Sequence, residues 1–157
     1  MNRILFSILL LFSASSCAVR QTSNALSPEQ QASMEKKVLV HVNDYRKSKN
    51  LSPLVSSESL AMLARTHSMG MQGRDKIDHN GFSGRVSKVR KQYPETYVAE
   101  NVGCKHRDSV PEKTVVDSWI NSQAHQANIL GNYRYTGIGV TQSAEGKVFF
   151  TQLFVSP

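Results

Sequence analysis

Cysteine is scarce in this sequence, whose 157 residues include only Cys17 and Cys104. Two cysteines allow one disulfide at most, so a packed core must hold the fold, and a chain of this length can bury one within a single domain. The sequence also lacks a run of about 20 apolar residues of the kind that crosses a membrane as a helix. We therefore expect one globular domain that does not depend on disulfides.

Acidic residues are outnumbered by basic ones, 12 against 19, which leaves a formal net charge of +7. Such an excess favours anionic partners, including lipid headgroups and acidic polymers. The lysines and arginines are scattered, and they lack the aromatic interleaving or fold motif expected of a protein that reads bases. We expect no nucleic-acid partner.

The N-terminus has the pattern of an export signal. A basic residue, Arg3, precedes an apolar stretch at residues 4–12 and small residues at 13–16, so residues 1–16 are predicted to be a cleaved signal peptide. Cys17 follows Ala14-Ser15-Ser16, a group that resembles the lipobox of bacterial lipoproteins. We expect a lipidated Cys17, a tether over residues 17–26, and an outer-membrane lipoprotein of the cell envelope. The alternative is cleavage without lipidation, which leaves Cys17 free or paired with Cys104 in a periplasmic or secreted protein.

The rest of the chain predicts an α+β domain over residues 27–157. Ser27 and Pro28 begin a helix that runs to about Lys49, and a second helix follows Ser56 or Ser57. A short basic helix is predicted over residues 83–93, and another begins at Ser109 and carries the stretch 115–130. A strand or turn is expected at 98–103, and residues 136–142 and 147–155 predict an antiparallel hairpin. Helices mostly before strands favour layers over a repeated βαβ architecture.

Five polar residues are candidates for a site or for structural roles. Ser122 and His125 are three apart, so on a continuing helix they would be neighbours on one face, although they could simply end that helix. His79 falls in a turn-like stretch at 78–81, and Glu100 stands between apolar residues, where a carboxylate needs a partner. His67 lies on the apolar stripe of the second helix, and we expect it to be a packed structural residue.

Many short motifs occur in a characteristic order along the chain. They are Asn43-Asp44-Tyr45-Arg46, Leu51-Ser52-Pro53-Leu54, Leu60, Ala64, His67-Ser68, Met71, His79, Arg85, Ala99-Glu100-Asn101-Val102, Trp119-Ile120-Asn121-Ser122, His125, Asn128-Ile129-Leu130, Gly137-Ile138-Gly139 and Phe150-Thr151-Gln152. This series resembles the CAP superfamily, also called the SCP domain, and its bacterial branch in particular. The resemblance implies a three-layer α-β-α sandwich around a small antiparallel sheet.

The resemblance also implies a cavity lined by two histidines and two glutamates, which in some members bind a divalent metal. His79 and Glu100 match the first of each, whereas Ser122 stands at the second glutamate position and Phe149 at the second histidine position. His125 could replace the missing histidine, so His79 and His125 are candidate ligands for Zn²⁺ or another divalent metal. The alternative that we favour is a hydrogen-bonded His–Glu pair that requires no cofactor.

These residues lead to two main hypotheses about function. The first is a monomeric binding module that presents a cavity made by His79, Glu100, Ser122 and His125 to a lipid, peptide or cell-wall ligand, and that is attached to the membrane by its lipid anchor. The second is a hydrolase in which a histidine acts as general base, oriented by Glu100, with Ser122 or a metal-bound water as nucleophile. A third is an envelope structural protein with a vestigial cavity. The resemblance implies no settled enzymatic activity, so we expect a binding protein and not an enzyme.

Overall fold

The computed structural model describes residues 25–106 and 110–156. The predicted signal peptide, Cys17 and nearly all of the tether lie outside these ranges. The elements in chain order are α1 (Pro28–Ser48), β1 (Val55–Ser56), α2 (Glu58–Arg74), α3 (Phe82–Gln92), β2 (Val98–His106), α4 (Pro111–Ile120), α5 (Gln123–Leu130), β3 (Tyr135–Gln142) and β4 (Lys147–Val155). Within the described ranges, no helix is both long enough and apolar enough to cross a membrane.

The four strands form one mixed sheet in the order β1-β3-β4-β2. The predicted hairpin of β3 and β4 is confirmed, and β2 pairs antiparallel with β4 on its other side. The two-residue strand β1 was not predicted, and it pairs in parallel with β3. The sheet is therefore mixed, with an antiparallel set of three strands and a short parallel edge.

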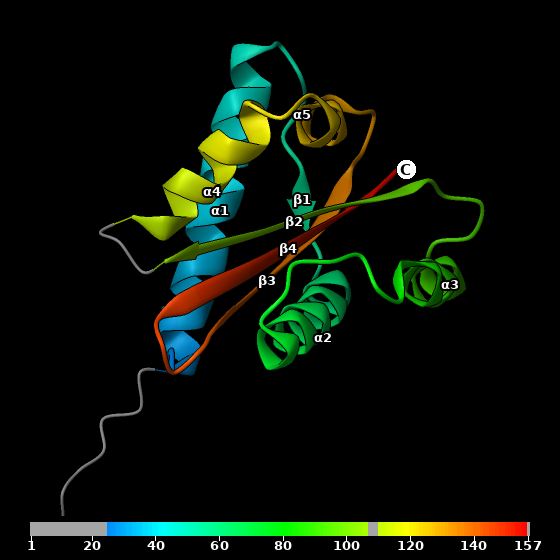
Figure 1. The fold of residues 1–157 in the computed structure, drawn as a ribbon. Coiled ribbons are helices and arrows are strands. Elements are labelled where there is room, and N and C mark those ends of the chain that lie inside the picture. Colours follow the sequence, from blue (N-terminus) through cyan, green and yellow to red (C-terminus); the bar gives the residue numbers. More distant parts are fainter. Residues whose placement is uncertain (1–24, 107–109, 157) are drawn as a thin grey trace, which may run out of the picture.

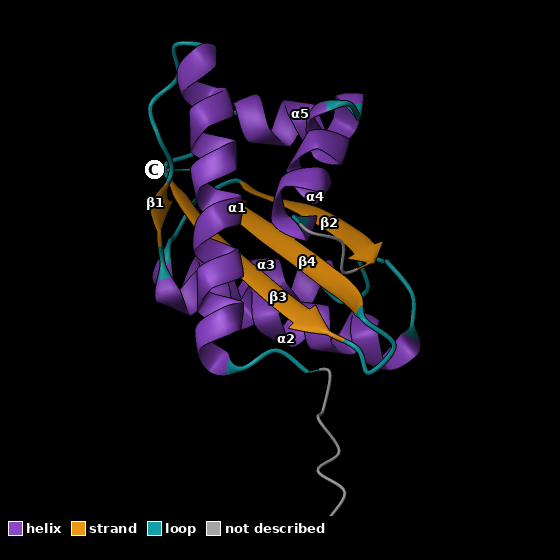
Figure 2. Ribbon diagram, turned by 90° about the vertical axis from the view of Figure 1, so that its left-hand side faces the viewer, coloured by secondary structure: helices purple, strands orange, loops and turns teal. Residues whose placement is uncertain are grey.

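Helices cover both faces of the sheet, as Figures 1 and 2 show. One face packs on α1, α4 and α5 in a core that includes Val38, Trp119 and Phe150. On the other face, α2 and α3 contribute Leu60 and Val89 to a smaller cluster. The predicted α+β class with three α-β-α layers is confirmed.

The start of α1 follows from its sequence. The Ser27 Oγ accepts a hydrogen bond from the Gln30 backbone N–H, and the Gln30 side chain accepts one from the Ser27 N–H. This capping box satisfies two backbone donors that the helix itself cannot satisfy. The predicted first residue of the helix, Pro28, is confirmed.

Two glycines let α2 pack directly on β3. A Cβ atom added to Gly137 would overlap the backbone of Leu60, and one added to Gly139 would overlap the backbone of Ala64 and Arg65. Alternating glycines in a strand are typical of such close packing. The sheet and α2 are thereby held at short distance, which fixes where the end of α2 and the following loop lie.

One expectation for α1 is wrong. The helical pattern placed Glu35 mostly outside the buried stripe, but it is 8% exposed. Its carboxylate pairs with Arg65 of α2 at 2.6 Å and accepts a hydrogen bond from the Val140 N–H of β3. A carboxylate can be buried when it has such partners, and periodicity alone does not reveal them.

The helix expected to continue through residues 115–130 is interrupted. Asn121 is the C-cap of α4, and Ser122 is the N-cap of α5 in an extended conformation. At the start of α4 the N-cap is Val110, not the predicted Ser109, which lies outside the described residues. The break turns α5 away from α4 and places the polar residues of the junction beside β2.

Candidate functional site

Glu100 is the centre of a buried polar cluster. It lies in β2 with its side chain 1% exposed, and the Arg85 guanidinium of α3 donates to both carboxylate oxygens at 2.6 and 2.7 Å. Arg85 is itself only 8% exposed, and its Nη1 donates to the Asn80 carbonyl at 2.8 Å. This bidentate pair compensates the buried negative charge.

His79 is held against the same carboxylate. Its Nδ1 lies 2.8 Å from the Glu100 Oε1, while 52% of its side chain is exposed. The turn that carries it is fixed by the Asn80 N–H, which donates to Asp78 at 3.0 Å, and by Gly81, whose φ of 72° suits glycine. A carboxylate that contacts Nδ1 favours the tautomer with its proton there, in which Nε2 is the acceptor.

His67 supports this arrangement from α2. It is 5% exposed, and its Nε2 lies 2.7 Å from the Asp78 carbonyl and 3.9 Å from the Glu100 Oε1. Burial lowers the pKa of His67 below its ordinary value of 6.5, so the ring is neutral at pH 7 and donates to the carbonyl. The predicted structural role of His67 is confirmed.

Ser122 and His125 meet across the first turn of α5. The His125 Nδ1 lies 2.8 Å from the Ser122 Oγ, and the Asn101 side chain of β2 donates to the His125 carbonyl at 3.1 Å. Burial lowers the pKa of His125, and the charge of His79 lowers it further. The two histidines, which are 46 positions apart in the sequence, are therefore within electrostatic reach of each other.

A cleft of about 230 Å³ follows β2 beside Ser122 and His125, and His79 and Glu100 are not among its lining residues. We call it the β2 cleft. Its lining includes Ile77, Cys104, Lys105, Trp119, Ser122 and His125. Burial raises the pKa of the Cys104 thiol, so the thiol is protonated and unreactive at neutral pH. Among the described residues that line the cleft none is acidic, so Lys105 gives it a positive character.

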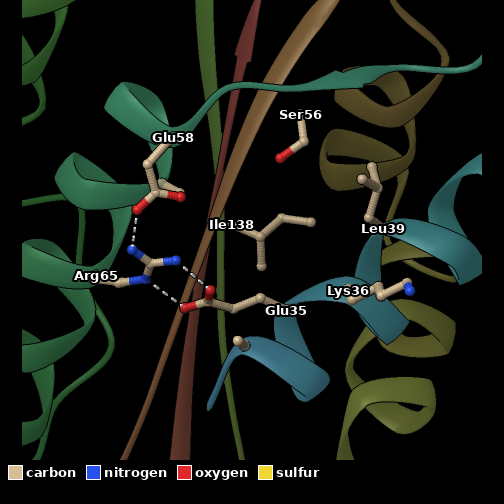
Figure 3. Close-up of a pocket in the computed structure, with 9 residues that line it drawn as sticks. Glu35, Lys36, Leu39, Ser56, Glu58, Arg65 and Ile138 are labelled. Atoms are coloured by element: carbon tan, nitrogen blue, oxygen red, sulfur yellow. Dashed lines mark hydrogen bonds and ion pairs between the residues drawn. The ribbon is translucent and has the colours of Figure 1, made fainter. Parts of the chain in front are cut away.

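A second pocket, of about 260 Å³, lies between α1, α2 and β3 (Figure 3). Arg65 spans it, and pairs with Glu35 at 2.6 Å and with Glu58 at 2.6 Å. Arg65 is the cationic partner of both carboxylates and joins α1 to α2. We assign these three side chains a structural role, because each charged group already has its partner.

The candidate residues do not fit a metal ion well. No group of three or more histidine, cysteine, aspartate or glutamate side chains with suitable geometry occurs in the described part of the chain. Both oxygens of Glu100 are already used by Arg85 and His79, and Phe149 is buried in an apolar cluster. Two imidazoles remain, fewer than the three protein ligands of a catalytic zinc site.

Comparison with known proteins agrees with the fold. Residues 39–154 match the model of the cysteine-rich secretory protein family, CAP. The chain belongs to this family. A relative, the uncharacterized protein YkwD of Bacillus subtilis (strain 168), is 28% identical over 144 residues, which are 90% of this chain and 54% of YkwD. The chain therefore spans about half the length of that relative.

Two solved bacterial structures have the same fold. An outer surface protein of Borrelia burgdorferi aligns with a TM-score of 0.68 at 18% identity, over 79% of this chain and 92% of the other. A cysteine-rich secretory protein of Staphylococcus aureus aligns with a TM-score of 0.67 at 23% identity, over 83% of this chain and 40% of the other. At these identities the likeness shows the shared fold.

Two members of the polar cluster were not singled out for the site from the sequence. Arg85 was predicted only as part of a short basic helix and as a residue that matches the family, yet it is buried against Glu100. Asn101 links β2 to α5 through His125 and Asn128. The one signal for Arg85 was Glu100 itself, because a buried acid requires a cationic partner, but the sequence offers many cations and does not say which one is near.

Proposed function

We propose that this protein is an exported CAP-domain binding protein of the bacterial envelope, and that its ligand is held by His79 and His125 at the β2 cleft. One observation carries the proposal. Each ring is anchored through Nδ1, to Glu100 or to Ser122, and neither Nε2 makes a hydrogen bond to another described residue. His125 lines the β2 cleft, and His79 lies outside the lining but within electrostatic reach of His125, so the two ring nitrogens could hold a polar ligand at the mouth of the cleft.

The charge balance favours binding over catalysis. Both oxygens of Glu100 are held by Arg85 and His79, so this carboxylate is not free to act on a ligand as a base or nucleophile. Glu100 therefore acts as a positioning group, since it fixes the tautomer and the direction of the His79 ring. The Nε2 of His79 then accepts a hydrogen bond from an N–H or O–H of the ligand.

The ligand expected from these groups is a peptide or cell-wall fragment that offers such donors and carries negative charge. Lys105 attracts a carboxylate to the cleft, and the sequence has a net charge of +7. A location at the cell surface is supported by the predicted export signal and by the likeness to a Borrelia outer surface protein. In this proposal a lipid on Cys17 anchors the domain.

Nuclear magnetic resonance of the histidine rings tests the proposal. Soluble peptidoglycan fragments and, separately, anionic phospholipid vesicles are added to the folded domain, and the ring signals of its five histidines are followed. The fragments should shift His79 and His125, and His79→Gln should weaken binding about tenfold. His41 lies on α1 and not in the cleft, so its signal should stay and His41→Gln should bind normally.

The proposal fails if the signals of His79 and His125 do not move, or if His41→Gln weakens binding as much as His79→Gln. Shifts with vesicles alone would make a lipid the ligand. Lipid extraction and metal analysis of one natively purified sample give an independent check, because a copurifying ligand or a stoichiometric metal would be found there.

The distance from Ser122 to His125 keeps hydrolysis as the second candidate function. The Ser122 Oγ lies 2.8 Å from an imidazole nitrogen, within reach for proton transfer. In the described structure no carboxylate orients this ring, in contrast to a complete triad. Release of product from cell-wall peptides that is abolished by Ser122→Ala would establish the enzyme. Unchanged binding by Ser122→Ala without turnover would support the binding protein.

A further inference from the structure

The outer edge of β2 has backbone groups that no other strand uses. β2 is the last strand of the sheet (Figures 1 and 2), and its carbonyls at Glu100 and Val102 accept bonds from the side chains of Asn128 and Trp119, at 3.4 and 2.9 Å. Every second residue of an antiparallel strand turns its N–H and C=O away from its partner. Cys104 continues the same alternation, so its N–H and C=O face the open side.

Between Val102 and Cys104, three groups on this edge are left without a described partner: the N–H of Val102 and both backbone groups of Cys104. Gly103 lies between them and pairs with Phe150 of β4, so its own N–H and C=O are occupied in the sheet. Cys104 and Lys105 are half-buried, so this stretch lies within a recess. An open strand edge is a template for another extended chain.

The β2 cleft runs along this same stretch. Val102, Gly103, Cys104 and Lys105 are among its lining residues. Ile77, from the loop after α2, lines it together with Trp119 and Ser122 from the helical layer on the other face of the sheet. An extended chain in the cleft would have Ile77 on one side and Trp119 and Ser122 on the other. The side chains of a strand point alternately to two such sides.

We propose that a short extended peptide that carries a carboxylate binds as a fifth strand on the open edge of β2. This inference rests on the proposed function and names the ligand class. The N–H groups of Val102 and Cys104 donate to two peptide carbonyls, and the Cys104 carbonyl accepts from a peptide N–H. Lys105 attracts the carboxylate, while His125 lines the cleft beside Ser122. The backbone supplies affinity and the cleft selects side chains.

Hydrogen exchange with a defined probe tests the backbone bonds. The probe is the N-acetylated peptide Thr-Val-Glu-Val-Glu with a free C-terminal carboxylate. Two control peptides have the same sequence, and each carries N-methyl groups on the alternate amides of one edge of the extended chain. The parent should slow exchange at Val102 and Cys104 at least about tenfold and leave Gly103 unchanged. The control peptide methylated on the edge that faces Cys104 should bind about tenfold more weakly than the parent peptide. The control peptide methylated on the other edge should bind as tightly as the parent peptide.

A proline substitution tests the same edge from the protein side. Cys104→Pro removes an N–H that points away from β4, and an edge strand tolerates proline when that side is open. Cys104→Ala also lacks the thiol but keeps the N–H, so it is the matched control. We expect Cys104→Ala to bind the probe and Cys104→Pro to lose it. If Cys104→Pro does not fold, the pair of methylated peptides decides the question.

The ring signals of His79 and His125 in the same sample separate this inference from the proposed function. Ring shifts without protection of Val102 and Cys104 would overturn strand addition and leave the binding role in place. The absence of both effects would overturn strand addition and count against a peptide ligand. A dimer of the unliganded domain that Cys104→Pro abolishes would show that a second copy covers the edge, and would also overturn the inference.

Discussion

The ion pair between Arg85 and Glu100 provides the sharpest test of how the cluster is held. Arg85→Met keeps a long apolar side chain but removes the guanidinium that donates to both carboxylate oxygens at 2.6 and 2.7 Å. The Glu100 side chain is 1% exposed, so water cannot replace the lost partner. We expect the free energy of unfolding to fall by about 3–5 kcal/mol, the usual cost of leaving one charge of a buried pair alone.

The double variant Arg85→Met/Glu100→Leu removes the remaining charge as well. An apolar pair of similar volume is often as stable as a buried ion pair, so most of the loss should be recovered. The double variant also removes the bond that orients His79, so stability and ligand binding should separate: the protein should be folded yet bind weakly. Lys88→Met, on the exposed side of the same helix, should change stability by no more than about 0.5 kcal/mol.

Urea unfolding followed by the emission of Trp119, the single tryptophan, measures all three variants. The reasoning is refuted if Arg85→Met unfolds at the same urea concentration as the wild type. It is also refuted if the double variant is less stable than Arg85→Met, because the cost would then lie in lost packing and not in an uncompensated carboxylate.

Three further predictions concern the core, the histidines and the anchor. Trp119→Ala should cost about 3–5 kcal/mol because the ring is 2% exposed and its Nε1 donates to Val102, and a melting curve that overlays the wild type would contradict this. Since burial lowers the pKa values of His67 and His125, the unfolded chain binds protons more readily. The free energy of unfolding should therefore fall as pH drops below about 6.5, and an unchanged slope in His67→Gln/His125→Gln would oppose this cause. Cys17→Ser should move the protein from the membrane fraction to the soluble one, and mass spectrometry that finds an unmodified Cys17 in the wild type would exclude the anchor.

Local chemistry was enough to predict most of the elements. Ser27 and Gln30 mark the start of α1 because a capping box involves only residues three apart. The hairpin of β3 and β4 follows from two β-branched stretches around a short turn, and Gly137 and Gly139 indicate close packing on β3. The two-residue strand β1 was missed, since its pairing depends on where Tyr135 and Thr136 lie in the fold.

The sequence by itself determined most helix and strand boundaries, because each depends on side chains that are near one another along the chain, and the three layers were implied by the resemblance to the CAP superfamily. Only the tertiary structure decided which charges meet. Arg85 pairs with Glu100, and the charge of His79 reaches His125, because α3, β2 and α5 converge at one end of the sheet. The open edge at Cys104 likewise depends on strand order, and hydrogen bonds between distant strands leave no periodic signal in the sequence.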